Sequence, residues 1–293
     1  MGPSGTLDDG RVAPSPRAAL AQALRNASYE VLPFRSTEEK VLAHVPRDVA
    51  LTVTSTEARG LEPTLELVGR LAGHGYDAAP HLAARLVRDA AHLADVVARL
   101  RESGVVSLFV IAGDAAEPAG DYPDALTLLE GLAALGNPFR TIGIAGYPEG
   151  HGSIDDQLIE QALKSKAPYA DHVVTQLCFD ASTTVRWAGT AHAAGVTLPV
   201  RVGIPGAVNR QKLVRISAGL GLGQSARFLR KQQSMLWRFF LPGGYSPNRL
   251  IERLAPHLGR PDNGLSGFHV FTFNELAGTE AWRRDRIERL SAS

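Results

Sequence analysis

Apolar runs of strand length alternate with amphipathic helical segments along most of the chain. We predict eight strands, at residues 28–32, 49–53, 77–80, 107–111, 140–145, 172–176, 199–202 and 269–273. Helical periodicity predicts helices at residues 37–43, 63–73, 89–103, 124–135, 154–166, 183–194, 210–218 and 247–258. Eight strands, each followed by a helix, favour an α/β fold with a single (β/α)8 TIM barrel, and an open doubly wound sheet is the alternative.

Three segments depart from this alternation. The interval between the seventh and eighth predicted strands is long, and we expect an extra helix there, around residues 227–239. Residues 1–16 are rich in Gly, Pro, Ser and Asp and are expected to form a disordered tail, with residues 17–293 forming one catalytic domain. Residues 280–289 are charged and predict a surface helix whose arginines are solvated.

Composition limits the classes of function. A chain of 293 residues with 44% hydrophobic residues can bury a full core, and a formal charge of +1 argues against an electrostatic nucleic-acid binder. The single cysteine, Cys178, forms no internal disulfide and is expected to be a buried small side chain. Without an apolar run of membrane-spanning length or a signal peptide, we expect a cytoplasmic protein with no membrane partner. The sequence does not determine the oligomeric state, and a homo-oligomer is one of the alternatives.

Polar side chains gather where the predicted strands end. They include Glu30, Thr54, His81, Asp114, Tyr147, Glu149, His151, Gln176 and Asn274. Because the carboxyl ends of parallel strands share one face of a barrel, these residues predict a functional site at that face.

The individual residues also allow structural interpretations. Glu30 is either paired with an arginine or a desolvated carboxyl suited to a general acid, and the sequence does not separate the two. Gly113-Asp114 alone favours a turn. His81 and His151 lack the spacing of metal ligands, so we expect hydrogen bonding or stacking and no metal. Gly219-Leu-Gly-Leu-Gly223 lacks the phosphate-loop pattern and is interpreted as a helix end.

An ordered series of short motifs resembles the methylenetetrahydrofolate reductase family. The motifs lie at residues 79–82 (APHL), 113–114 (GD), 145–151 (AGYPEGH), 164–166 (KSK), 175–180 (TQLCFD), 203–205 (GIP) and 271–274 (FTFN). Each is short, but their order and spacing run from the first predicted strand to the last. The resemblance implies a TIM barrel that reduces 5,10-methylenetetrahydrofolate to 5-methyltetrahydrofolate with NADH or NADPH.

Roles for particular residues follow from this resemblance. Glu30 matches the family's acid on the first strand, which protonates N10 of folate and opens the five-membered ring. Asp114 is a second catalytic residue and contacts the pterin, which Gln176 and Phe179 also bind. The positions that contact the flavin in FAD-containing members are Thr54, His81, Tyr147, His151 and Lys166.

The chain also departs from the family pattern. The usual Arg-Gly-Asp is Ala112-Gly113-Asp114, which removes a cation that would lie against FAD. The first-strand Phe-Glu-Phe appears as Tyr29-Glu30-Val31. These changes favour direct hydride transfer without flavin, although the FAD-dependent mechanism stays open. Two further alternatives are a non-catalytic folate-binding relative and an FAD-dependent dehydrogenase of another substrate on the same barrel.

Overall fold

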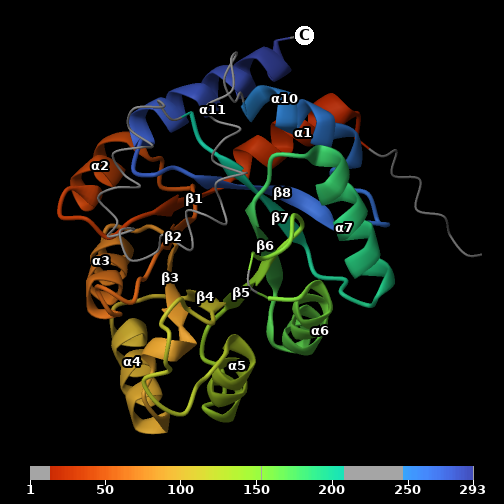
Figure 1. The fold of residues 1–293 in the computed structure, drawn as a ribbon. Helices are drawn as coiled ribbons and strands as arrows, with labels where there is room; N and C mark the ends of the chain where they lie inside the picture. The colour runs from red at the N-terminus through yellow and green to blue at the C-terminus, as the bar shows by residue number, and fades with distance from the viewer. Residues whose placement is uncertain (1–13, 153, 208–246, 293) are drawn as a thin grey trace, which may run out of the picture.

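A computed structural model describes residues 14–152, 154–207 and 247–292 of the chain. Its eight parallel strands close into a barrel in chain order, with β1 bonded to both β2 and β8, and helices surround them (Figure 1). The strands are β1 (Ser28–Val31), β2 (Leu51–Val53), β3 (Ala78–Ala83), β4 (Ser107–Ile111), β5 (Thr141–Gly146), β6 (His172–Leu177), β7 (Val200–Pro205) and β8 (Leu265–Phe271). The prediction of a (β/α)8 TIM barrel is confirmed.

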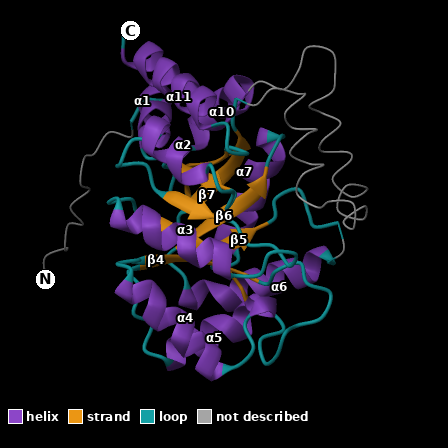
Figure 2. Cartoon of the chain, turned by 90° about the vertical axis from the view of Figure 1, so that its left-hand side faces the viewer, coloured by secondary structure: helices purple, strands orange, loops and turns teal. Residues whose placement is uncertain are grey.

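The outer layer consists of helices that run back between the strands, as the side view in Figure 2 shows. They are α1 (Pro16–Arg25), α2 (Thr37–His44), α3 (Glu62–Gly73), η1 (Ala84–Leu86), α4 (Ala90–Glu102), α5 (Ala125–Ala134), α6 (Asp156–Lys166), η2 (Ala167–Tyr169), α7 (Ala181–Ala193), α10 (Pro247–Leu254), η3 (Ala255–His257) and α11 (Leu276–Ser291). Four of these helices begin at an aspartate whose carboxylate accepts a backbone N–H of the first turn: Asp89, Asp124, Asp155 and Asp180.

Several strand boundaries differ from the sequence prediction, and two of the differences affect the site. β3 continues past Pro80, because the chain pairs with β2 up to that residue and then with β4 from His81 to Ala83. β8 begins at Leu265 rather than at residue 269. As a result His81 and His269 lie within strands, where the prediction had placed them at strand ends.

The prediction that the arginines of residues 280–289 are solvated is wrong for Arg283. Its side chain is buried, and it forms an ion pair with Glu280 at 2.9 Å within α11. The Tyr29 hydroxyl of β1 donates to the same carboxylate at 2.7 Å. Glu280 therefore fastens α11 to the outside of the barrel, next to α1 (Figure 1).

Several expectations fall outside the described residues. These are the helix at 210–218, the extra helix around 227–239, the Gly219–Gly223 turn and most of the disordered tail. Cys178 is described and fully buried, as expected, and burial raises the pKa of its thiol to about 12. Among the described helices none is long and apolar enough to cross a membrane.

Candidate active site

Glu30 lies inside the barrel, near the carboxyl end of β1. It pairs in register with Thr52 of β2 and Phe271 of β8. Its neighbours Tyr29 and Val31 are fully buried on the opposite side of the strand, since successive side chains of a strand alternate between faces. The Glu30 side chain is 15% exposed and projects among residues of β3 and β8.

Two histidines flank the Glu30 carboxyl. Nε2 of His81 lies 3.7 Å from Oε2 of Glu30, and Nε2 of His269 lies 4.0 Å from the same oxygen. Nδ1 of His269 is hydrogen-bonded to the Ser28 hydroxyl at 2.8 Å, and its Nε2 faces the Thr52 hydroxyl at 3.4 Å. Residues from β1, β2, β3 and β8 therefore form one connected cluster that contains the Glu30 carboxyl.

Burial keeps all three ionisable groups of this cluster neutral. Desolvation raises the pKa of Glu30 to about 8 and lowers the pKa of His81 to about 3. The pKa of His269 falls well below its usual value, first through burial and then through the charges of His81, Arg201 and His172. Because no described residue donates a hydrogen bond to the Glu30 carboxylate, nothing stabilises its ionised form. At neutral pH Glu30 is a protonated acid.

Asp114 lies in the loop that follows β4 and is exposed. Its carboxylate accepts the backbone N–H of Glu57 at 3.3 Å, which links this loop to the one after β2. In that second loop the hydroxyls of Thr54 and Ser55 are buried and lack a hydrogen-bond partner among the described residues. They are free to bind a ligand at the mouth of the barrel.

Two of the residues expected at the pterin lie near the end of β6, Gln176 within the strand and Phe179 in the loop that follows it. Glu149, which follows β5, accepts the backbone N–H groups of Phe179 and Asp180 at 2.6 and 2.9 Å. Gln176 is half-buried, and its side-chain oxygen accepts the N–H of Leu177 at 2.9 Å. Glu149 thereby fixes the path of the loop that contains Phe179.

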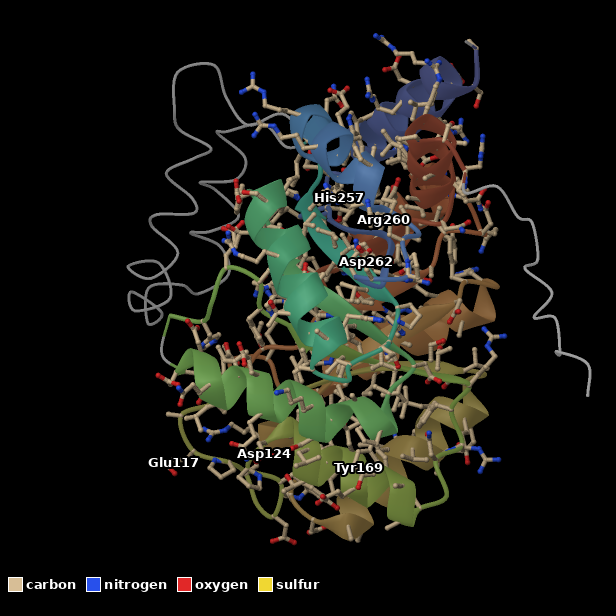
Figure 3. The ribbon with its side chains drawn as sticks, turned by 90° about the vertical axis from the view of Figure 1, so that its right-hand side faces the viewer. Glu117, Asp124, Tyr169, His257, Arg260 and Asp262 are labelled. Carbon is tan, nitrogen blue, oxygen red and sulfur yellow. The ribbon has the colours of Figure 1, made fainter. Side chains whose placement is uncertain are left out.

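The remaining expected cofactor contacts occupy two places. The rings of Tyr147 and His151 meet edge to face with centroids 5.2 Å apart in the loop after β5. Lys166 is buried at the end of α6; burial lowers its pKa to about 8, and the charge of Asp124 opposes this shift. Figure 3 shows Asp124 and Tyr169 along the edge of the molecule where α5 and α6 lie.

These residues do not fit the phosphates of a flavin dinucleotide. Ala112 carries no charge where the family pattern has arginine, and burial disfavours the charged form of Lys166, although the charge of Asp124 favours it. Arg85, from the neighbouring η1, donates to the carbonyl oxygens of three residues in the loop after β4: Ala115, Ala116 and Pro123. Its guanidinium shapes this loop and does not replace the missing arginine.

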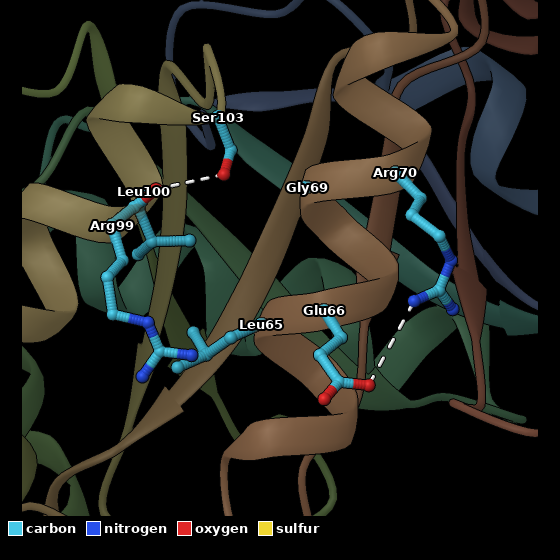
Figure 4. A pocket seen from close by; sticks show the side chains of 7 residues that line it. All are labelled: Leu65, Glu66, Gly69, Arg70, Arg99, Leu100 and Ser103. Carbon is cyan, nitrogen blue, oxygen red and sulfur yellow. Dashed lines mark hydrogen bonds and ion pairs between the residues drawn. The ribbon is translucent and has the colours of Figure 1, made fainter.

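The described residues contain no group of three or more His, Cys, Asp or Glu side chains arranged to hold a metal ion. A groove of about 330 Å³ lies outside the barrel, between α3 and α4, lined by Leu65, Glu66, Gly69, Arg70, Arg99, Leu100 and Ser103 (Figure 4). Its arginines are paired, Arg70 with Glu38 and Arg99 with Glu62. None of the residues that line the groove belongs to the Glu30 cluster, so the groove is separate from it.

The sequence prediction missed Ser28, His269 and the bridging role of Glu149. Alternation along β8 offers a signal for His269, because Gly267, His269 and Phe271 share one face of the strand. That signal becomes visible only when the strand is extended back to Leu265.

Comparison with known proteins identifies the family. A family model described as methylenetetrahydrofolate reductase matches residues 27–221, from β1 through β7 and beyond. The chain belongs to the methylenetetrahydrofolate reductase family. Glu30, His81, Asp114 and Gln176 all lie within the matched residues, and His269 lies outside them.

Individual relatives are similar over shorter stretches. Methylenetetrahydrofolate reductase 1 of Schizosaccharomyces pombe is 32% identical over 115 residues, which are 36% of this chain and 19% of the relative. Methylenetetrahydrofolate reductase 2 of Saccharomyces cerevisiae is 27% identical over 121 residues, 38% of this chain and 20% of the relative. The matched stretches thus span about a fifth of these relatives. A solved structure of 2,3-dimethylmalate lyase has 11% identity and a TM-score of 0.45, covering 84% of this chain and 96% of that one.

Proposed function

We propose that this protein reduces 5,10-methylenetetrahydrofolate to 5-methyltetrahydrofolate with NADH or NADPH, by direct hydride transfer. The observation that carries the proposal is the state of Glu30. It is a desolvated carboxyl with its pKa raised to about 8, within the residues that the family model matches, and the motif resemblance assigns it the role of the family's first-strand acid. A group that must give a proton at neutral pH needs such a pKa, because an ordinary glutamate would already be ionised.

The chemical step needs one proton and one hydride. Glu30 gives its proton to N10 of the folate, the bond between N10 and the methylene carbon breaks, and an iminium forms between that carbon and N5. Hydride from the reduced nicotinamide adds to the methylene carbon and leaves a methyl group on N5. The protein's contribution is to protonate N10 and to orient the two substrates.

The neighbouring loops supply the binding residues in this proposal. Asp114, Gln176 and Phe179 contact the pterin, with Phe179 held by the Glu149 bridge. Thr54, Tyr147 and His151 line the electron donor's side of the barrel mouth, where Thr54 has an unused buried hydroxyl. The misfit to flavin phosphates at Ala112 and Lys166 supports transfer without FAD.

The test is a spectrophotometric assay with purified protein. The near-ultraviolet absorbance of NADH or NADPH is followed after addition of 5,10-methylenetetrahydrofolate, with and without added FAD. We expect oxidation that depends on the folate and is unchanged by FAD. Product is confirmed by chromatography, so that an unrelated oxidase activity is not counted.

Two outcomes would change the proposal. A requirement for FAD would establish a flavin mechanism despite Ala112. No folate-dependent oxidation with either donor would remove the reductase function and leave the fold and family unchanged.

A further inference from the structure

The imidazole of His81 has a feature that the proposed function does not use. Its Nε2 is buried and has no hydrogen-bond partner among the described residues. The ring is packed against Phe109 of β4, with centroids 4.7 Å apart, which restricts its position. A buried nitrogen without a hydrogen-bond partner destabilises the folded state. The protein therefore keeps this nitrogen free at a cost in stability.

The second histidine of the cluster differs. Nδ1 of His269 is bonded to Ser28 at 2.8 Å and its Nε2 has the Thr52 hydroxyl at 3.4 Å. It also lies farther from Glu30, at 4.0 Å against 3.7 Å for His81. His269 is thus occupied with its own neighbours, whereas the unpartnered nitrogen of His81 faces the carboxyl oxygen alone.

A protonated carboxyl has an O–H group that needs an acceptor, and a neutral imidazole has one nitrogen that accepts. A separation of 3.7 Å is just beyond hydrogen-bond length, so a small rotation of the Glu30 side chain closes it. We propose that His81 is a positioning residue for Glu30, whose carboxyl proton its Nε2 accepts as a hydrogen bond and holds until folate binds. The hydrogen bond does not depend on the proposed function, but its effect on catalysis rests on that function.

The charges around this pair favour the same arrangement. Burial is the cause of the pKa shifts of both Glu30 and His81. The other groups whose charges reach the cluster act on His269, and they are Arg201 of β7 and His172 of β6. A neutral imidazole can accept a hydrogen bond from the O–H group of Glu30 while the proton stays on the carboxyl. In this role His81 holds the acid proton near the folate and takes no part as a proton donor.

The first test needs no substrate, and it uses a variant only to assign a signal. Histidine labelled with ¹⁵N reports which ring nitrogen carries the proton, and His81 is assigned by the signal lost in His81→Gln. We expect Nε2 of His81 to be unprotonated and hydrogen-bonded at neutral pH. A proton on Nε2 would overturn the proposal, whatever the activity of the protein.

The second test is infrared difference spectroscopy of the Glu30 carboxyl, defined by the band that Glu30→Gln removes. His81→Gln keeps an oxygen acceptor near the position of Nε2, and His81→Met has similar length with only the weak acceptor of a thioether. We expect the carbonyl band to stay in place in His81→Gln and to move to higher frequency in His81→Met. An unmoved band in a folded His81→Met protein would contradict the proposal. If this variant does not fold, the labelled-histidine measurement decides the question.

Kinetics show whether the hydrogen bond matters for turnover. We expect kcat to fall about tenfold in His81→Met with KM for folate unchanged, and to recover in His81→Gln, because a misplaced acid slows proton transfer without weakening binding. His172→Gln is the matched control, because His172 is a half-buried histidine at the start of β6 and no ion pair or hydrogen bond joins it to Glu30 among the described residues. A rise in KM with kcat unchanged would make His81 a substrate contact and overturn the positioning role. Spectra as expected in a protein without reductase activity would locate the failure in the proposed function.

Discussion

Two glutamates lie on opposite sides of strand β1, and their surroundings shift their pKa values in opposite directions. Glu280 of α11 lies behind the strand, where it accepts the Tyr29 hydroxyl at 2.7 Å and pairs with Arg283. Burial opposes its ionised form, but the hydrogen bonds from Arg283 and Tyr29 outweigh this and lower its pKa. Glu30, the next residue along the strand from Tyr29, has two neutral histidines beside it, and its pKa rises to about 8.

The comparison separates an ionised structural carboxylate from a neutral, desolvated carboxyl. Partners that hold Glu280 ionised make it a strong link between helix and barrel, and they would make it useless as a proton donor at neutral pH. The site around Glu30 omits such partners and so keeps its proton available, at a cost in stability. Each of the following variants tests one side of this contrast.

The largest effect is expected for Glu30→Gln. The amide cannot give a proton to N10, so we expect kcat to fall by about 10²–10⁴-fold, the range of general acid catalysis. Folate binding, measured by fluorescence titration, should persist, because the amide keeps the shape of the side chain. Normal turnover in this variant would show that Glu30 has no part in the reaction.

Glu280→Gln should act on stability instead. It leaves the buried Arg283 without its charged partner, which typically costs about 3–5 kcal/mol of unfolding free energy. Denaturant unfolding measures the loss, and Glu288→Gln at an exposed position of the same helix is the control. Equal stability of the two variants would show that the buried pair contributes little.

A smaller, opposite effect on stability is expected for Glu30→Gln. The pKa of Glu30 is about 8 in the folded protein and 4.5 in a free chain, so the folded state binds the extra proton between these values. Stability of the natural protein should therefore fall as pH rises from about 4.5 to 8, and this part of the slope should vanish in the variant. Near pH 8 we expect Glu30→Gln to be more stable by on the order of 2 kcal/mol, from thermal unfolding across that pH range. Parallel stability curves for the two proteins would contradict the raised pKa.

The smallest effect is expected at Asp114, a third carboxylate that is exposed and solvated. Asp114→Asn removes its charge but keeps an oxygen for the Glu57 N–H. We expect folate binding or hydride transfer to weaken about tenfold, the loss of one charged hydrogen bond. Unchanged steady-state kinetics would mean that Gly113-Asp114 serves only as a turn.

The sequence predicted the barrel well because its apolar runs have the length and spacing of alternating strands and helices. It also drew attention to Glu30, since a carboxyl between apolar neighbours is conspicuous, but it did not separate a paired carboxylate from a desolvated acid. It could not predict that Glu30, His81 and His269 meet, because closure of the barrel brings them together. Proline at position 80 looks locally like a strand end, and only the pairing with β4 shows that the strand continues.

The buried ion pair of α11 escaped prediction for a similar reason. A run of charges at residues 280–289 looks solvated when no partner is visible in the sequence. The partner of Glu280 is the hydroxyl of Tyr29, some 250 residues away along the chain, and Arg283 is buried against the backbone carbonyl of Leu24. Contacts between residues far apart in the sequence decide which charged side chains are buried in ion pairs.

The most direct test of the contrast between the two glutamates is a pH titration followed by carbon NMR. Glutamate labelled with ¹³C at its side-chain carboxyl gives one signal per residue, and Glu30→Gln and Glu280→Gln assign the two that matter. We predict that Glu30 titrates with a pKa of about 8 while Glu280 stays ionised down to acidic pH. A Glu30 signal that titrates near 4.5, the ordinary value for glutamate, would contradict the account of Glu30 as a neutral acid.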